Sequence, residues 1–253
     1  MLQISETLLT QQLTVFLLPM FRILGVMSAA PILSSRAVPV RSRIGLAVLI
    51  AVLIAPLIKA PVSVSFEPSM LLLQTAHEVA IGLAIGFAAR LVLTAAEIGG
   101  ELIGLQMGLS FAGFFDPQSG SANAIGRLVS TMALLTFVVL DGPQLLLAAV
   151  VRSFAVLPLT LEASLPIGAA QLARFGTGIF GSALSIALPI VAMQLIVNLV
   201  LGIVSRVAPQ FNVFAIGFPV TIGSGLLLLA LGLPVLDQAL IGATEQMLGL
   251  LGL

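Results

Sequence analysis

Residues 175–205 read FGTGIFGSALSIALPIVAMQLIVNLVLGIVS, and none of them is charged. A helix needs about 20 consecutive apolar residues to cross a bilayer, so this stretch is long enough for a span. The rest of the chain is similar, because 59% of its 253 residues are hydrophobic and only 8% are charged. Ten basic and ten acidic side chains are too few to cover a water-soluble protein of this size. The sequence therefore predicts an all-α, polytopic membrane protein.

Composition also excludes several functional classes. The formal net charge is zero, so the chain has no basic field that would attract nucleic acid. With no Cys and a single His, neither a disulfide nor a zinc triad can be built. His77-Glu78 begins like the metalloprotease helix motif, but Ile81 stands where that motif needs its second His. We therefore expect no catalytic residue, no metal and no cofactor, and we expect that the protein is not an enzyme.

Several apolar segments are awkward as simple membrane spans. Segment 44–58 is shorter than the roughly 20 residues that cross a bilayer, and Asp141-Gly142-Pro143 breaks segment 128–151. Broken helices at membrane depth are tolerated only against protein or water. We therefore expect helical hairpins and broken helices packed in a multi-subunit assembly. The remaining apolar segments lie near 8–33, 69–96, 98–115, 175–205 and 213–236, before an amphipathic tail at 237–253.

Small residues mark the faces on which helices are expected to pack closely. They recur every four positions, which places them on one stripe of a helix where two backbones can approach. No long polar tract or linker separates these segments, so the sequence predicts a single membrane-embedded domain, 1–253. The stripes are Gly82 and Gly86; Gly100, Gly104, Gly108 and Ala112; and Gly178 and Ser182.

A polar stripe runs along one otherwise apolar segment. Arg90, Thr94, Glu97 and Glu101 stand at i, i+4, i+7 and i+11, so they share one face of a helix. Such a face either lines an aqueous conduit or contacts another subunit, and the residues alone favour neither. A rival interpretation is a stand-alone secondary transporter or small channel with its site at Glu78, Arg90 and Glu97.

The most unusual segment is GLQMGLSFAGFFDPQSG, residues 104–120. Its glycines and its Asp-Pro turn predict a loop or a break between helices, whereas Met107, Phe111, Phe114 and Phe115 keep it apolar. Bulky apolar side chains on a loop can block a pore and exclude water from it. The alternative is an ordinary re-entrant loop packed into the core.

The stretch SRVAPQFNVFAIGFP, residues 205–219, closely resembles the signature of the FliR/SctT family of type III secretion export gates. Segment 104–118 resembles the same family, and its flagellar branch more than its injectisome branch. Two positions depart from the family pattern, because Val220-Thr221 stands where a basic residue often follows Gly-Phe-Pro, and Pro143 stands where a His often follows Asp-Gly. The signature residues are Arg206, Pro209, Gln210, Asn212, Phe214, Gly217 and Pro219.

The resemblance implies a core subunit of the flagellar export gate in the bacterial inner membrane, at the flagellar basal body. Its partners would be the P and Q subunits in a hetero-oligomer and the B subunit at the cytoplasmic entrance. Residues 1–170 would look like a P subunit and residues 171–253 like a Q-subunit hairpin. Unfolded rod, hook and filament proteins would be the cargo. The residues that correspond to the family's plug are Met107, Phe111, Phe114 and Phe115.

Overall fold

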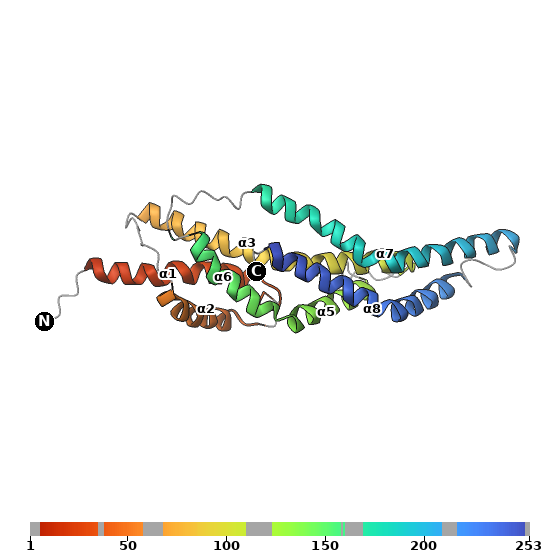
Figure 1. Ribbon diagram of the computed structural model, residues 1–253, viewed down its shortest axis with the longest axis horizontal. Coiled ribbons are helices and arrows are strands. Elements are labelled where there is room, and N and C mark those ends of the chain that lie inside the picture. Colours follow the sequence, from red (N-terminus) through yellow and green to blue (C-terminus); the bar gives the residue numbers. More distant parts are fainter. Residues whose placement is uncertain are drawn as a thin grey trace. The chain divides into compact units, whose positions relative to one another are not determined.

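A computed structural model describes most of the chain, namely residues 6–34, 38–57, 68–109, 123–157, 159, 169–208 and 217–250. These residues form helices and no strand, which confirms the predicted all-α fold (Figure 1). The helices are α1 (Glu6–Ala29), α2 (Val40–Ile54), the short 3-10 helix η1 (Ala55–Leu57), α3 (Pro68–Gln106), α5 (Ala124–Val139), α6 (Gly142–Val156), α7 (Ala169–Val207) and α8 (Phe218–Leu250).

Three helices are long and apolar enough to cross a membrane: Ser69–Gln106 of α3, Gly176–Val207 of α7 and Phe218–Glu245 of α8. Helices α5 and α6, taken together across the break between them, are also long and apolar enough to form one interrupted span. These lengths confirm the prediction of a polytopic membrane protein. The most apolar parts of α7 and α8 are only 22% buried, against 56% for α3. Most of the α7 and α8 surface therefore faces lipid or other subunits.

The helix boundaries show which apolar segments join. Segments 69–96 and 98–115 both contribute to one helix, because α3 continues through Glu97 as far as Gln106, in agreement with the polar stripe predicted on one helix face over 90–101. Glutamate is a good helix former, so one charged residue between two apolar segments does not end a helix. The expected break between α5 and α6 is confirmed, and Asp141 takes a left-handed backbone with φ 56° at that point.

The chain divides into two compact units that interleave along the sequence. Unit 1 comprises Met1–Arg90, Asp141–Phe175 and Met247–Leu253, and unit 2 comprises Leu91–Leu140 and Gly176–Gln246. The single-domain reading and the expected parts 1–170 and 171–253 stay predictions.

In unit 1, glycines let α1 and α3 approach each other closely. A Cβ added at Gly82 would collide with the carbonyl oxygen of Arg22, and one added at Gly86 would lie 2.5 Å from the Val26 carbonyl oxygen. From the other side, a Cβ at Gly25 would lie 2.6 Å from the carbonyl oxygen of Val79. Residue numbers rise in the same direction along both helices, with Arg22 opposite Gly82 and Val26 opposite Gly86, so α1 and α3 run parallel. The predicted stripe at 82 and 86 is therefore a real helix contact.

The same two helices carry a buried ion pair. Arg22 Nε donates to Glu78 Oε2 over 2.6 Å, and Arg22 Nη2 donates to Glu78 Oε1 over 3.0 Å. Arg22 is 0% exposed and Glu78 is 3% exposed. The two-pronged geometry matches a planar guanidinium to a carboxylate and satisfies both charges away from water.

Arg22 also ties the α6 segment to this pair. Its Nη1 donates to Ser153 Oγ and its Nη2 to the Leu157 carbonyl oxygen, each over 3.0 Å. The guanidinium carbon lies 4.1 Å from the centre of the Phe154 ring, a distance at which the ring face attracts a cation. One side chain of α1 thus contacts α3, α6 and the residue that follows α6.

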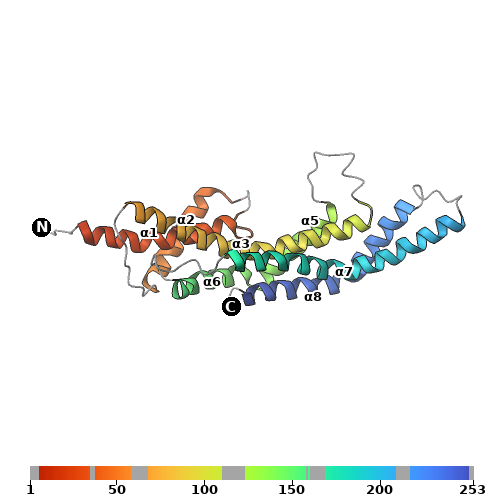
Figure 2. The same cartoon turned by 90° about the horizontal axis from the view of Figure 1, so that it is seen from above.

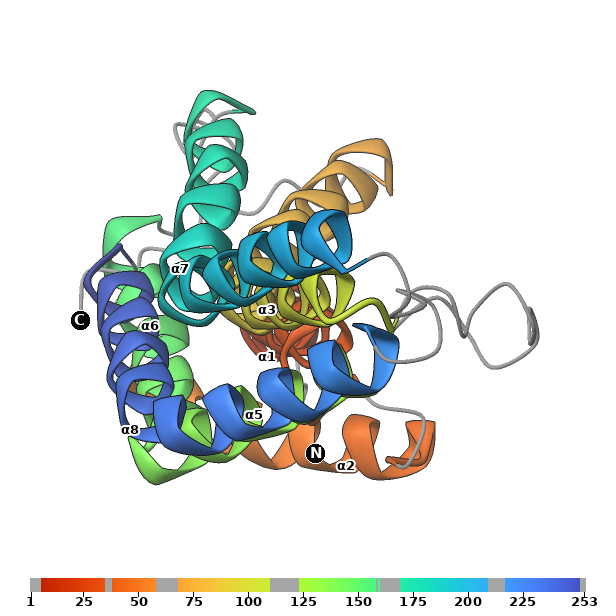
Figure 3. The ribbon, with the colours of Figure 1, turned by 90° about the vertical axis from the view of Figure 1, so that its right-hand side faces the viewer.

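In unit 2, the C-terminal half of α3 packs against α5 and α7, whose ribbons lie beside it in the end-on view (Figure 3). Gly99 lies against Ala183 and Ile186 of α7, and Gly100 lies against α5. Helices α7 and α8 lie side by side (Figure 2), held by the Gln194 amide, which donates to the Thr221 carbonyl oxygen over 2.9 Å. The core between these helices includes Ala96, Ile103, Val129, Ile186, Ile190 and Leu236.

Gly82→Ala should destabilise unit 1, because its Cβ would collide with backbone rather than with a flexible side chain. We expect a loss of about 1–3 kcal/mol in the free energy of unfolding. Gly45→Ala is the matched control, since no atom lies within 4 Å of its added Cβ, and it should stabilise α2 by about 0.5–1 kcal/mol. Thermal unfolding in detergent, followed by circular dichroism, compares the two. Equal midpoints would contradict the close contact.

Glu78→Leu should lower the yield of folded protein sharply, because it leaves the Arg22 guanidinium buried and unpaired. Breaking such a pair typically costs about 3–5 kcal/mol. The double variant Arg22→Leu/Glu78→Leu removes both charges and should cost less than Glu78→Leu alone. Glu245→Leu, at an exposed position, serves as the control. A double variant as unstable as the sum of the singles would show that the charges do not interact.

Candidate functional site

The predicted apolar loop starts where α3 ends, and that end has a well-defined geometry. Gly108 has φ +80°, the Leu109 amide donates to the Gly104 carbonyl oxygen, and the Gly108 amide donates to the Leu105 carbonyl oxygen, both over 3.0 Å. This pair of bonds is the Schellman arrangement that ends a helix at a left-handed glycine. Gly108 therefore turns the chain out of α3 instead of extending the predicted small-residue stripe.

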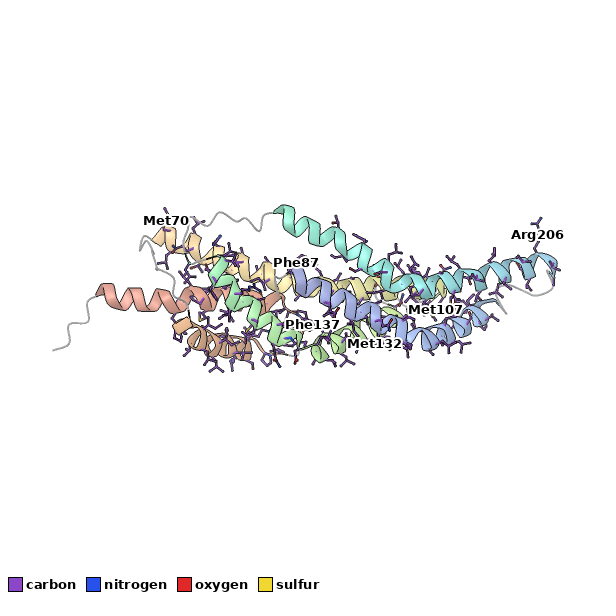
Figure 4. All side chains as sticks on the ribbon, in the orientation of Figure 1. Met70, Phe87, Met107, Met132, Phe137 and Arg206 are labelled. Atoms are coloured by element: carbon purple, nitrogen blue, oxygen red, sulfur yellow. The ribbon has the colours of Figure 1, made fainter. Side chains whose placement is uncertain are left out.

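Met107 is fixed at this end of α3. It is 0% exposed, and its Cε and Sδ lie 2.8 and 2.9 Å from where a Cβ on Gly225 of α8 would stand (Figure 4). The Asn198 side chain of α7 donates from Nδ2 to the Gln106 carbonyl oxygen over 3.3 Å. The last turn of α3 is thus held by both α7 and α8.

The other end of the loop returns to the same part of α3. Asn123 caps α5, because its Oδ1 accepts from the Gly126 amide over 2.7 Å, while its Nδ2 donates to the Glu101 carbonyl oxygen over 3.2 Å. Its side chain occupies the space beside Gly104, where an added Cβ would lie 2.6 Å from Asn123 Cγ. The described ends of the loop, Leu109 and Asn123, are therefore both anchored at Gly104, one by a backbone bond and one by contact.

The predicted plug residues divide between described and undescribed positions. Met107 lies in the core of unit 2 at the base of the loop. Phe111, Phe114 and Phe115 lie outside the described residues, so their assignment stays a prediction.

The predicted polar stripe is a continuous feature of α3, but its members differ in exposure. Arg90 is exposed, whereas Thr94, Glu97 and Glu101 are half-buried. Arg90 and Thr94 both have interaction partners, and Glu101 Cγ lies 3.0 Å from where a Cβ on Gly126 of α5 would stand. The stripe's role at a conduit or a subunit contact stays a prediction.

The three residues of the transporter site, Glu78, Arg90 and Glu97, differ in how accessible they are to a solute. Both oxygens of Glu78 accept hydrogen bonds from Arg22 and the residue is buried, so its charge is already paired and shielded from a solute ion. The neighbouring Nε2 of His77 and the buried amide of Gln74 have no hydrogen-bond partner within the described part of the chain. The same part of the chain holds no group of three His, Asp or Glu side chains that could bind a metal.

The family signature, residues 205–219, runs from the last turn of α7 to the first turn of α8. Arg206, in the last turn of α7, is exposed and points away from the ribbon (Figure 4). Gly217 is buried, and Pro219 stands exposed in the first turn of α8. The signature residues Pro209, Gln210, Asn212 and Phe214 lie outside the described residues.

Sequence reasoning missed the amides that hold the loop ends. Asn123 precedes an apolar run, which is the normal signal of a helix cap, but its bond to the Glu101 carbonyl oxygen has no local signal. Gln194 and Asn198 are isolated amides in a long apolar stretch, and such residues usually bond between helices.

Known proteins match this chain over most of its length. The family model described as bacterial export proteins, family 1, matches residues 13–247. The flagellar biosynthetic protein FliR of Pectobacterium carotovorum subsp. carotovorum is 39% identical over 224 residues, covering 87% of this chain and 85% of the relative. FliR of Escherichia coli K12 is 38% identical over 240 residues, covering 93% and 90%. FliR of Bacillus subtilis 168 is 34% identical over 227 residues, covering 87% and 86%. The chain therefore belongs to family 1 of the bacterial export proteins, the FliR family.

Proposed function

We propose that this chain is a core subunit of the flagellar type III protein export gate, and that it forms part of the conduit for unfolded rod, hook and filament proteins. Membership in a family of bacterial export proteins supports this function, as do relatives named flagellar biosynthetic proteins. The apolar helices α3, α7 and α8 suit a membrane-embedded component. We place the assembly in the bacterial inner membrane, at the flagellar basal body.

The observation that carries the proposal is the anchoring of the apolar loop. Its described ends, Leu109 and Asn123, are both tied to Gly104, so these two residues lie close together on α3. A loop fixed in this way can hold bulky side chains across a passage and still yield to a polypeptide. We assign Phe111, Phe114 and Phe115 to the plug and the buried Met107 to its base.

The partners are inferred from the same family membership. The exposed apolar faces of α7 and α8 suit contact with lipid or other subunits, and we assign P and Q subunits to the hetero-oligomer and the B subunit to its cytoplasmic entrance. In this scheme the stripe Arg90, Thr94, Glu97 and Glu101 lines the conduit or contacts a neighbouring subunit. The protein acts without a cofactor and is not an enzyme, because its role is to conduct rather than to convert its cargo.

A stand-alone transporter fits the structure less well. Its proposed site needs Glu78 to be free for an ion or solute, but the Arg22 guanidinium occupies both oxygens of that carboxylate. Family membership also favours a component of an export apparatus.

Purification of the C-terminally tagged chain from native membranes in mild detergent should recover P and Q subunits at a fixed ratio. The exposed apolar surface of α7 and α8 is the physical reason, because it must be covered by other molecules. Mass spectrometry of the intact complex gives the ratio. Recovery of a lone chain, under conditions shown to preserve membrane complexes, would overturn the export-gate assignment.

Replacing Phe111, Phe114 and Phe115 together by Ala should raise the ion conductance of the idle, assembled gate in a planar bilayer. The three rings are the large apolar groups of the loop, and their loss removes the barrier that keeps water and ions out. Phe87→Ala/Phe180→Ala is the control, since both rings are exposed on helices outside the loop. Unchanged conductance with normal assembly would remove the plug assignment.

A further inference from the structure

Asp237 is a charged residue on a helix whose surroundings are apolar. It lies in α8, within the candidate span Phe218–Glu245, and its side chain is exposed on the surface of the chain. Leu233 and Pro234 precede it by one turn, share its face of the helix and are also exposed. The Asp237 carboxylate therefore stands on an apolar surface that nothing in the described chain covers.

The packing of α7 against α8 gives the level of Asp237 along the span. The two helices run antiparallel, and a Cβ added at Gly232 would lie 3.4 Å from Ile190 Cγ1. Asp237 comes five residues after Gly232 and is therefore level with about residue 185 of α7. At a rise of about 1.5 Å per residue, this level is about 15 Å from the nearer end of the uncharged stretch 175–205. A hydrocarbon core about 30 Å thick, centred on that stretch, contains Asp237.

The hairpin of α7 and α8 offers this carboxylate no cation. Residues 175–205 of α7 carry no charge, and α8 has no Lys or Arg between Phe218 and Leu250. Asp237 forms no hydrogen bond or ion pair with any other residue that the structure describes. A second copy of the same hairpin would bring more carboxylates and no base, so the missing cation must belong to a different chain.

An ionised carboxylate at membrane depth is costly unless it is paired, and lipid tails cannot pair it. We propose that the face of α8 around Asp237 is an interaction surface, and that its partner is an apolar helix of another subunit that carries a Lys or Arg side chain. The complementary charges give the contact its specificity, while the exposed Leu233 adds apolar area. This inference rests on the proposed function, because it requires that the chain act within a hetero-oligomer.

Substitutions at Asp237 in the tagged complex, purified from native membranes, test the charge pair. Asp237→Asn keeps the size of the side chain and removes its charge, so co-purified subunits per chain should fall at least about tenfold. Asp237→Arg should lose them altogether, whereas Asp237→Glu should retain them. Glu245→Gln is the matched control, because it neutralises an exposed carboxylate at the end of the same span and should leave recovery unchanged.

The stability of the chain by itself distinguishes an external partner from an internal one. Asp237→Asn should melt no lower than wild type in detergent, because the carboxylate has no partner in the described part of its own chain. Circular dichroism on the separately purified chains measures this.

A photo-crosslinking residue at Gln238, which is exposed beside Asp237, identifies the partner segment by mass spectrometry. A Lys or Arg within one turn of the crosslinked position is then changed to Asp and combined with Asp237→Arg. If the two side chains pair directly, this exchange of charges should restore recovery to within about twofold of wild type, although each single change abolishes it.

The outcomes separate this inference from the proposed function. If wild type recovers the other export subunits and Asp237→Asn recovers them equally well, the interaction surface is wrong and the export-gate assignment stands. If wild type recovers no other subunit, the assembly itself is wrong, and the inference falls with it. A crosslinked segment without a basic residue would overturn the inference alone, as would an Asp237→Asn chain that melts below wild type.

Discussion

The buried guanidinium of Arg22 sets the strictest requirement in unit 1. A charge that is 0% exposed must find its partners within the protein, because an unpaired ion in an apolar interior costs several kcal/mol. Arg22 makes four hydrogen bonds, two to Glu78 and one each to Ser153 and Leu157, and it faces the Phe154 ring. These partners come from α3, α6 and the residue after α6. One side chain therefore joins all of these segments to α1.

The ion pair and the glycine contact of α1 and α3 depend on each other. Glu78 and Gly82 are one turn apart on α3, and both meet Arg22: Glu78 holds its guanidinium, and Gly82 leaves room for its carbonyl oxygen. A larger residue at position 82 would push the helices apart and lengthen the two bonds at position 78. The ion pair therefore requires a residue without a side chain at position 82, one turn from Glu78. This requirement explains why the charged Glu78 and the small-residue stripe lie on the same face of α3.

The sequence predicted which segments form helices and where a helix breaks better than it predicted which residues contact each other. Apolar run lengths predicted the membrane helices, Asp141-Gly142-Pro143 predicted the break before α6, and four-residue spacing predicted the glycines that pack at 82, 86, 100 and 104. The same spacing also marked Gly178, yet no atom lies within 4 Å of a Cβ added there, because a periodic pattern does not say whether a second helix is present. Arg22 and Glu78 are each charged residues within apolar segments of the sequence. Their pairing is 56 residues apart in sequence, and no local pattern encodes such a distance.

In unit 2, amide side chains form the polar bonds between helices, whereas in unit 1 a buried ion pair does so. Asn123, Gln194 and Asn198 each donate to a backbone carbonyl oxygen of another helix, at Glu101, Thr221 and Gln106. A neutral amide costs far less to bury than a charge, and each of its bonds is correspondingly weaker. Unit 1 is thus joined by a charged network that is costly to break, whereas in unit 2 each of these amides adds one weaker bond to helices that already pack through an apolar core.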